Sequence, residues 1–265
     1  MFATEKHIST KHYFYIDVDY LKLDLKVAEN VSDADVLIGV KEVPIEALIP
    51  NKSYFFFSHT IKKQPYNRDL LRAILDKNIT LYDHETLIDE NNQRLIGFGY
   101  YAGVVGAYNG MRTLGLKEHS FDLPKAYTLN GLKELKSELD AISLPNIKII
   151  LTGTGRVGLG AKEILDHLKI KQVSIGEFLS KNFNEAVYVQ LDVMDYCERI
   201  DGKQLGKLDF FQHPEAYRST FDRFTPVADM FVAGHFYGKG APVFFTREQA
   251  KAASFNLKVV ADISC

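Results

Sequence analysis

Side chains suited to proton transfer follow two apolar, strand-like runs in the first third of the chain. Lys41 and Glu42 come directly after one run, and His59 and Lys62 come shortly after the next. Ligands of open parallel sheets bind at the carboxyl ends of the strands, so we expect these residues to share one crevice. Lysine acts as a base when desolvation or a neighbouring cation lowers its pKa, and imidazole titrates near neutral pH. A single histidine is more often structural and a single lysine more often solvated, but the matched placement favours a catalytic pair.

A glycine-rich run in the second half of the chain indicates a different chemistry, the binding of a dinucleotide. Gly153, Gly155 and Gly158 follow the β-prone run 147–152 and precede the segment 162–168, whose apolar residues have helical spacing. In that context the first glycine permits a sharp turn, the second lets the backbone approach a pyrophosphate, and the third allows close helix packing. The N–H groups at the start of the helix attract phosphate. The alternative is a glycine-rich turn that binds no ligand.

Several neighbours complete the predicted cofactor site. Arg156 and Val157 lie within the turn, where Arg156 can cover the pyrophosphate. An acid about 20 positions after the glycines typically binds the ribose of NAD; the predicted next strand is 172–175, and the nearest acid is Glu177. We therefore favour NAD, with NADP as the open alternative. Asp262, at the end of a predicted strand, either approaches the nicotinamide side or serves as a turn or cap residue.

Strand-like and helix-like segments alternate along the chain, which predicts an α/β fold with parallel sheets and helices on their faces. We expect two Rossmann-like domains with an interdomain cleft: residues 1–125 as the substrate and catalytic domain, and residues 126–265 as the NAD(P)-binding domain. The predicted strands are 35–40, 53–57, 79–82, 147–152, 187–191, 230–233 and 257–262, and the predicted helices are 66–78, 99–116 and 132–139.

The predicted helix 99–116 carries small residues at helical spacing, namely Gly103, Gly106, Ala107 and Gly110. Each glycine costs a helix up to about 1 kcal/mol relative to alanine. Such a stripe therefore predicts close packing against another backbone, and we interpret the segment as a linking helix between the two domains.

Composition limits the class of protein. The chain has 265 residues, 46% of them hydrophobic and 25% charged, with a net charge of -2; this suits a globular protein with a sizeable core and disfavours a nucleic-acid partner. No apolar run approaches the roughly 20 residues of a membrane span, and the first residues lack a signal-peptide core. Cys197 and Cys265 are expected to be free thiols, and no metal site is predicted. We expect a cytoplasmic protein.

Five motifs in the same order along the chain resemble one enzyme group, the NAD-type saccharopine dehydrogenases and lysine-ketoglutarate reductases, which belong with alanine dehydrogenase and the transhydrogenase α subunit. The resemblance extends from about Asp33 to Cys265. The motifs are Gly39–Pro44, Phe55–Gln64, Phe98–Gly106, Gly153–Gly158 and Ala261–Cys265, and the segments His213–Tyr217 and Ala241–Thr246 also look like that group.

The resemblance implies a reversible reaction in which lysine and 2-oxoglutarate form an imine that a nicotinamide cofactor reduces to saccharopine. By matching motif, Lys41 is the base toward the secondary amine, and His59 handles the proton transfers that add or remove water at the imine carbon. A secondary amine needs such a base, and the hydride must come from a cofactor because side chains do not supply it.

The same resemblance assigns supporting roles to four further residues. Glu42 and Glu85 tune the two catalytic groups, while Lys62 and Arg94 hold substrate carboxylates, which need cationic partners. For Glu85 and Arg94 the alternative is a surface ion pair of little consequence.

Two departures from the group leave other functions open. Met1–Asn30 contains no segment of the form E-x-R-R-x-P, so the start of the first domain is expected to be shortened, and the sequence ends at Cys265 within a motif. One alternative is an alanine dehydrogenase or another opine-forming or amino-acid oxidoreductase. Another is a truncated, non-catalytic nucleotide-binding relative. In either enzymatic case the partner is a small amino-acid or 2-oxo-acid substrate, and the chain is a monomer or homodimer without a nucleic-acid or membrane partner.

Overall fold

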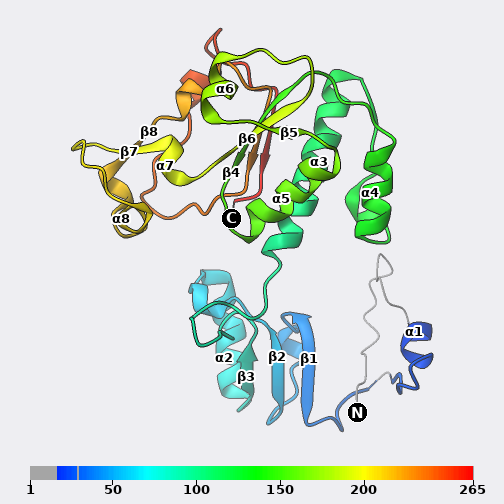
Figure 1. Ribbon diagram of the computed structural model, residues 1–265. Helices are drawn as coiled ribbons and strands as arrows, with labels where there is room; N and C mark the ends of the chain where they lie inside the picture. Colours follow the sequence, from blue (N-terminus) through cyan, green and yellow to red (C-terminus); the bar gives the residue numbers. More distant parts are fainter. Residues whose placement is uncertain (1–16, 29, 265) are drawn as a thin grey trace. The chain divides into compact units, whose positions relative to one another are not determined.

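The computed structural model describes residues 17–28 and 30–264, and the chain divides into two units between Gly97 and Phe98 (Figure 1). The sequence prediction placed this boundary between residues 125 and 126. The difference arises from helix α3 (Gly99–Glu118), which packs against helix α5 (Arg156–His167) and strand β10 (Val259–Asp262). This helix is thus part of the second unit. Much of Met1–Asn30, and Cys265, lie outside the described residues.

The first unit contains a parallel sheet with the strand order β1-β2-β3. Alternate residues of β2, Tyr54 and Phe56, point to one face and pack against Leu70 and Ile74 of α2, as the period-2 pattern of a strand requires. The strands are β1 (Val36–Lys41), β2 (Ser53–Phe57) and β3 (Thr80–Asp83); the helices are α1 (Asp17–Leu21) and α2 (Arg68–Asp76), with 3-10 turns at Ile45–Ala47, Thr60–Lys62 and Pro65–Asn67.

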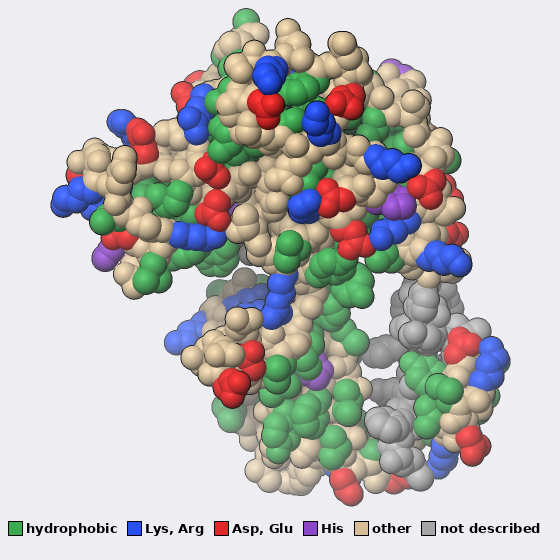
Figure 2. Space-filling model, viewed as in Figure 1, with side chains coloured by type: hydrophobic (Ala, Val, Ile, Leu, Met, Phe, Trp, Pro, Cys, Tyr) green, Lys and Arg blue, Asp and Glu red, His purple; other side chains and the backbone are tan. Residues whose placement is uncertain are grey.

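Strand β1 presents apolar side chains to solvent. Val36, Ile38 and Val40 are each about half exposed or more, and Phe55 of β2 stacks on Tyr82 of β3 with ring centroids 4.5 Å apart. Figure 2 shows hydrophobic side chains gathered over this sheet.

None of the helices in the described residues combines the length and the hydrophobicity that a membrane span requires.

The second unit is built on a five-stranded parallel sheet with the order β10-β9-β4-β6-β5. Its strands are β4 (Lys148–Thr152), β5 (Lys171–Gln172), β6 (Val187–Leu191), β9 (Met230–Ala233) and β10, and a small antiparallel pair consists of β7 (Cys197–Arg199) and β8 (Tyr217–Ser219). Its remaining helices are α4 (Leu132–Asp140), α6 (Ile175–Ser180), α7 (Val193–Tyr196), α8 (Lys207–Gln212) and α9 (Arg247–Ala250), with 3-10 turns at Ala126–Thr128, Pro214–Ala216 and Phe221–Arg223. The parallel α/β architecture predicted from the sequence is confirmed.

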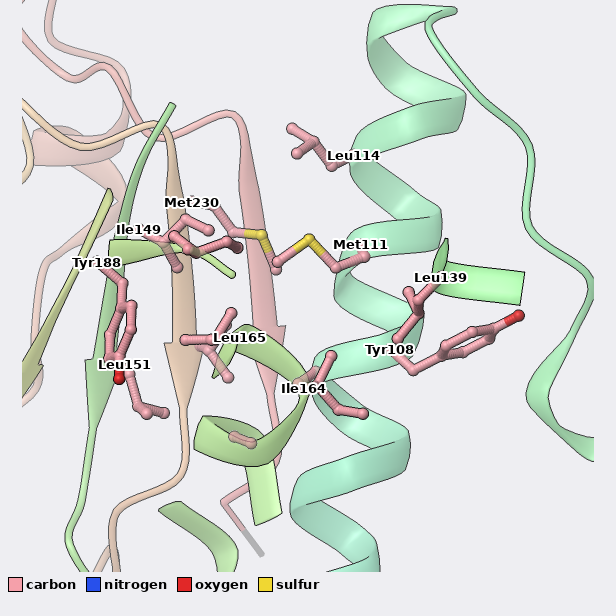
Figure 3. Close-up of a cluster of buried hydrophobic side chains, with 14 of the residues drawn as sticks. Tyr108, Met111, Leu114, Leu139, Ile149, Leu151, Ile164, Leu165, Tyr188 and Met230 are labelled. Carbon is pink, nitrogen blue, oxygen red and sulfur yellow. The ribbon is translucent and has the colours of Figure 1, made fainter. Parts of the chain in front are cut away.

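Hydrophobic side chains cover both faces of this sheet, which is typical of parallel sheets. On one face Ile149 and Leu151 of β4 pack with residues of α3 and α5; Figure 3 shows Met111 of α3 and Met230 of β9 pointing toward each other in this cluster. On the other face Ile150 packs with a second cluster that includes the buried thiol of Cys197. That thiol is free, as predicted, and burial raises its pKa to about 12.

Glycines allow the backbones of α3 and α5 to touch. A Cβ atom on Gly103 would collide with the carbonyl oxygen of Val157, and one on Gly160 would collide with the carbonyl oxygen of Tyr100. A Cβ atom on Gly106 would meet the side chain of Ile263, beyond the end of β10. The predicted close packing of the small-residue stripe is therefore confirmed, and its partners α5 and β10 belong to the same unit as α3.

Some elements differ from the sequence prediction. The expected strand 172–175 is reduced to β5, two residues long, because Ser174 begins helix α6 instead. The pair β7–β8 and helix α8 were not predicted, since their segments are short and lack a clear period. Of these unpredicted elements, α8 lies beside the glycine turn at which the sequence predicts the cofactor site.

We predict that Gly160→Ala lowers the free energy of unfolding by about 1–3 kcal/mol, the usual cost of overpacking, because the new methyl group meets backbone atoms of α3. Gly176→Ala in α6 is the matched control, since nothing lies within 4 Å of its Cβ position; there alanine should leave stability unchanged or raise it by up to about 1 kcal/mol. Urea denaturation of both variants is the measurement. Equal effects in the two variants would contradict the packing argument.

Candidate active site

The carboxyl ends of three parallel strands bring the predicted catalytic residues together. Strand β1 ends at Lys41, while His59 and Glu85 each lie two residues beyond the ends of β2 and β3. The register pairs Lys41 with Phe57 at the end of β2, so the strands end at nearly the same level. This is the edge at which ligands of open parallel sheets bind.

A hydrogen-bonded chain joins the three side chains. Nζ of Lys41 lies 3.3 Å from Nε2 of His59, and Nδ1 of His59 lies 3.1 Å from Oε2 of Glu85. An ionised carboxylate only accepts hydrogen bonds, so Nδ1 donates to Glu85 and Nε2 is left to accept from the Lys41 ammonium. The side chain of Glu85 is 3% exposed and that of His59 is 22% exposed, so solvent screens this pair weakly.

Glu85 also binds the two cations assigned to substrate carboxylates. Its Oε1 lies 3.1 Å from Nη2 of Arg94 and 3.5 Å from Nζ of Lys62. Because the carboxylate is buried, this is not the surface ion pair that the sequence left open. With Lys41, three cations lie around one carboxylate, so the cluster has an excess of positive charge that suits an anionic ligand.

The backbone of His59 is held in an uncommon conformation. Its φ is +57°, in the left-handed region that costs a residue with a Cβ about 1–2 kcal/mol. Its carbonyl accepts a hydrogen bond from Nδ2 of Asn67 at 3.3 Å. The hydroxyl of Ser58 donates to the carboxylate of Asp83 and accepts from the N–H of Thr60 at 3.1 Å. These bonds fix the loop, so the imidazole is already ordered before a ligand binds.

Glu42 takes no part in this network. Glu42 is exposed, and its side chain makes no hydrogen bond or ion pair within the described residues 17–28 and 30–264. Of the two carboxylates that the resemblance assigned to tuning Lys41 and His59, the structure brings Glu85 into contact with His59, and Glu42 contacts neither.

The glycine turn of the second unit has the geometry that a dinucleotide requires. Gly153 has φ of +93°, and a Cβ atom there would collide with the carbonyl oxygen of Gly234; a Cβ atom on Gly158 would collide with the carbonyl oxygen of Gly153. By contrast, nothing lies within 4 Å of the Cβ position of Gly155, and this residue lines a cavity of about 330 Å³. The first and third glycines therefore serve packing, and the second leaves room for a pyrophosphate at the start of α5.

The cavity lies where the strands of the sheet end. The chain passes from β4 to β5 and β6 on one side and to β9 and β10 on the other, so β4 lies at the switch point of the topology, where such sheets bind nucleotides. The lining consists of Gly153–Val157 after β4, Asp192 and Val193 after β6, Tyr196 of α7, Gly234–Phe236 after β9, Ile263 and Ser264 after β10, and Lys207 and Phe211 of α8. Arg156 and Val157, two of the residues predicted for the cofactor site, are thus part of this lining.

Glu177, predicted to bind the adenosine ribose, has another role. It is the third residue of α6, where it forms a capping box with Ser174. Hydrogen bonds from Lys181 and Ser174 lower its pKa to about 2. Glu177 does not line the cavity, and the physical reason is the strand order: β5, which precedes it, lies at the edge of the sheet, with β6 between β5 and β4.

Asp192 has the position expected of that acid. It follows β6, the strand hydrogen-bonded to β4 on this side, and it lines the cavity. Its Oδ2 accepts hydrogen bonds from Nζ of Lys207 at 2.5 Å and from Oγ1 of Thr154 at 3.1 Å. Burial acts to raise the pKa of Asp192, but these bonds outweigh it and the pKa lies below its usual range. The sequence does place an acid directly after the predicted strand 187–191. The sequence analysis overlooked it because it looked for the acid near the strand that follows the glycine turn along the chain.

Asp262 takes the turn role that the sequence left as its alternative. At the end of β10, its Oδ1 accepts from the N–H and the hydroxyl of Ser264 at 3.0 and 2.6 Å. Asp262 does not itself line the cavity, although Ile263 and Ser264 do. The aspartate therefore shapes the turn that borders the cofactor side.

His235 is a cavity residue that the sequence analysis did not single out. It follows β9, and its Nδ1 lies 2.8 Å from Oγ1 of Thr152, the last residue of β4. Burial lowers its pKa to about 4, against an opposing effect of the Asp262 charge. The imidazole is therefore neutral at physiological pH.

Comparisons with known proteins agree with the motifs. Residues 9–105 match the family model for the alanine dehydrogenase/PNT N-terminal domain. Bovine mitochondrial alpha-aminoadipic semialdehyde synthase is 31% identical over 259 residues, covering 89% of this chain and 28% of the bovine protein. The saccharopine dehydrogenase [NAD(+), L-lysine-forming] of Candida glabrata is 33% identical over 152 residues, covering 53% of this chain and 41% of that protein.

A solved L-alanine dehydrogenase matches with a TM-score of 0.51 and 14% identity, covering 89% of this chain and 58% of that one, which supports the fold. The fold is thus the α/β fold of alanine dehydrogenase-like proteins. These matches support the resemblance to the saccharopine dehydrogenase group and its relatives that the motifs predicted. The chain spans less than half the length of the two curated relatives.

We predict that His235 makes stability depend on pH in a defined window. The folded-state pKa of about 4 lies below the ordinary value of 6.5, so between these values the unfolded chain binds more protons. The contribution of neutral His235 is complete above pH 6.5 and is lost as the pH falls toward 4. Urea denaturation at pH 7.5 and pH 5 should show a smaller pH-dependent loss in His235→Gln than in the wild type.

The matched control is His213→Gln, whose side chain is 58% exposed; it should retain the pH dependence of the wild type. If His235→Gln retained it too, the buried neutral state of His235 would be contradicted.

Proposed function

We propose that the chain is a saccharopine dehydrogenase-type oxidoreductase, which transfers a hydride between NAD(P) and the C–N bond that joins lysine to 2-oxoglutarate in saccharopine. The observation that carries this proposal is the hydrogen-bonded chain of Lys41, His59 and Glu85 at the carboxyl ends of three parallel strands. The names of the curated relatives support the substrate class.

Lys41 acts on the amine. In the oxidative direction the secondary amine of saccharopine loses a proton to the neutral Lys41 amine as its C–H bond gives up a hydride, and the C–N bond becomes an imine. When bound, the nicotinamide ring accepts that hydride, or donates it in the reverse direction. The 3.3 Å contact with Nε2 of His59 gives the Lys41 proton an acceptor. His59, whose side chain is 22% exposed, releases that proton to solvent before it acts on water, so one proton is released for each hydride transferred.

His59 acts on water. Nε2 takes a proton from water as its oxygen bonds to the imine carbon, and the proton is returned to nitrogen when the C–N bond breaks to release lysine and 2-oxoglutarate. The bond from Nδ1 to the buried carboxylate of Glu85 holds the ring in the tautomer whose Nε2 can accept a proton. One water is consumed for each hydride transferred, so atoms and charge balance.

Lys62 and Arg94 bind substrate carboxylates. Both contact the same oxygen of Glu85, and both side chains are about half exposed, so an anion in solution can reach them. A guanidinium can hold a carboxylate through two parallel hydrogen bonds. The excess of positive charge favours saccharopine, which carries three carboxylates, over a monocarboxylic substrate.

On the cofactor side, Gly155 and the start of α5 hold the pyrophosphate, and Asp192 accepts hydrogen bonds from the adenosine ribose. A carboxylate at this position favours NAD, because it repels the 2′-phosphate of NADP. The neighbouring Lys207 offsets part of that repulsion, so we expect a preference for NAD rather than complete exclusion of NADP.

The reaction is tested by mixing the chain with lysine, 2-oxoglutarate and NADH or NADPH and following the nicotinamide absorbance. We predict lysine-dependent oxidation that falls about 100-fold or more in Lys41→Met and in His59→Ala, since general acids and bases contribute that much, while the affinity for the cofactor is retained. Lys133→Met and His213→Ala, which alter exposed residues of the second unit, are the matched controls and should keep wild-type turnover.

Other outcomes of the same assay select the alternatives. Turnover with pyruvate and ammonia in place of lysine and 2-oxoglutarate would indicate an alanine dehydrogenase. Cofactor binding without any turnover would indicate a nucleotide-binding relative. Unchanged turnover in both Lys41→Met and His59→Ala would show that the site assignment is wrong.

For the cofactor, we predict that Asp192→Ser raises the ratio of NADPH affinity to NADH affinity about 10-fold, because a hydrogen bond to a charged group is lost and the repulsion of the 2′-phosphate disappears. Calorimetric titration with both nucleotides measures the ratio. Glu177→Gln, which preserves the capping box, should leave the ratio unchanged. A change of the affinity ratio in Glu177→Gln without one in Asp192→Ser would instead support Glu177 as the acid that binds the ribose.

A further inference from the structure

One polar group of the cofactor cavity has no part in the proposed reaction. His235 lines the cavity, and its Nδ1 is taken by the hydroxyl of Thr152. Its Nε2 makes no hydrogen bond with the residues that the structure describes. We propose that Nε2 of His235 is a hydrogen-bond donor to an oxygen of the nicotinamide nucleoside, either of its ribose or of its carboxamide. This inference rests on the proposed use of the cavity by a nicotinamide dinucleotide.

The donor role follows from the partner of Nδ1. Thr152 is fully buried, and within the described part of the chain its hydroxyl has no acceptor other than Nδ1 of His235. An O–H group left unpaired in the interior would bear the full cost of its desolvation, so the hydroxyl donates to Nδ1. That nitrogen then carries no proton, and in the neutral ring the proton is on Nε2. The Nε2–H group of His235 is therefore a donor without a partner among the described residues, on a side chain that lines the cavity.

The strand order indicates which half of the cofactor it meets. Asp192 follows β6 on one side of β4, and His235 follows β9 on the other side. With the pyrophosphate on the glycine turn after β4, a dinucleotide whose adenosine ribose meets Asp192 places its nicotinamide half over the end of β9. His235 and the adenosine ribose site are thus on opposite sides of the turn.

The ring is held in place before any ligand binds. Its centroid lies 4.5 Å from that of Phe244 and 6.2 Å from that of Tyr196, and the bond to Thr152 fixes its rotation. The preceding residue, Gly234, contacts the backbone of the glycine turn. A donor held this rigidly loses little entropy when it binds an acceptor, and Phe236 and Ile263 add apolar surface to the lining of the cavity.

The test compares the affinities of three ligands for the full chain by calorimetry: NADH, ADP-ribose and ADP. We expect His235→Leu to lose about 10-fold in NADH affinity and to bind ADP as the wild type does, because ADP lacks the nicotinamide nucleoside. His235→Gln, whose amide N–H can take the place of Nε2–H, should recover most of the loss. A loss with ADP-ribose as well places the acceptor on the ribose, and no loss with ADP-ribose places it on the carboxamide; both results support the proposal.

Three results would overturn it. One is His235→Leu binding NADH as tightly as the wild type; another is an equal loss for NADH and ADP, which would indicate a general disturbance of the cavity. The third comes from the wild type itself, so it does not depend on a variant that folds. Nitrogen NMR of the histidine rings, with the His235 signal assigned from its absence in His235→Gln, should show the proton on Nε2, and a proton on Nδ1 would refute the argument.

The failure of the underlying function gives a different result. A wild-type chain that binds neither NADH nor NADPH would overturn the proposed function and this inference together. If NADH binds and turns over but His235→Leu changes nothing, the inference alone fails.

Discussion

Close contact between backbones is the constraint on which the cofactor side depends. Gly103 and Gly160 bring α3 and α5 together, and Gly158 rests against Gly153, which in turn contacts Gly234 at the end of β9. This series of backbone contacts runs from the helix layer to the strand ends, and each contact excludes a Cβ atom. It fixes where α5 begins, and so where its N–H groups point. Gly155 differs from these glycines because its backbone makes no such close contact. The absence of a side chain there leaves space in the cavity.

In the first unit, a buried carboxylate has the corresponding role. Glu85 binds His59, Lys62 and Arg94 through its two oxygens. A buried charge is tolerated when it is paired and hydrogen-bonded, so these partners offset the burial of the carboxylate while it orders them. Removing Glu85 would leave several like charges at one strand edge. The arrangement thus couples the orientation of His59 to that of Lys62 and Arg94.

The sequence predicted local features well and spatial neighbours less well. The strands that end at Lys41 and before His59 were predicted from their apolar runs, and parallel strands then require these side chains to meet. Glu177 was a mistaken choice because a periodic pattern locates strands but does not reveal their order in the sheet. With β6 beside β4, Asp192 becomes the acid near the turn. Lys207 was passed over because its short helix has too few turns to show a period. The unit to which α3 belongs was likewise decided by packing against α5.

His59 and His235 show how a partner at one ring nitrogen decides the chemistry of the other. Both histidines use Nδ1 for an internal hydrogen bond and keep Nε2 for another group. At His59 the partner is the carboxylate of Glu85, which accepts a hydrogen bond from Nδ1, so Nε2 carries no proton and can accept one. At His235 the partner is the hydroxyl of Thr152, which donates, so Nε2 keeps the proton and burial disfavours a second one. The same side chain is therefore suited to proton transfer in one unit and to fixed recognition of a neutral acceptor in the other.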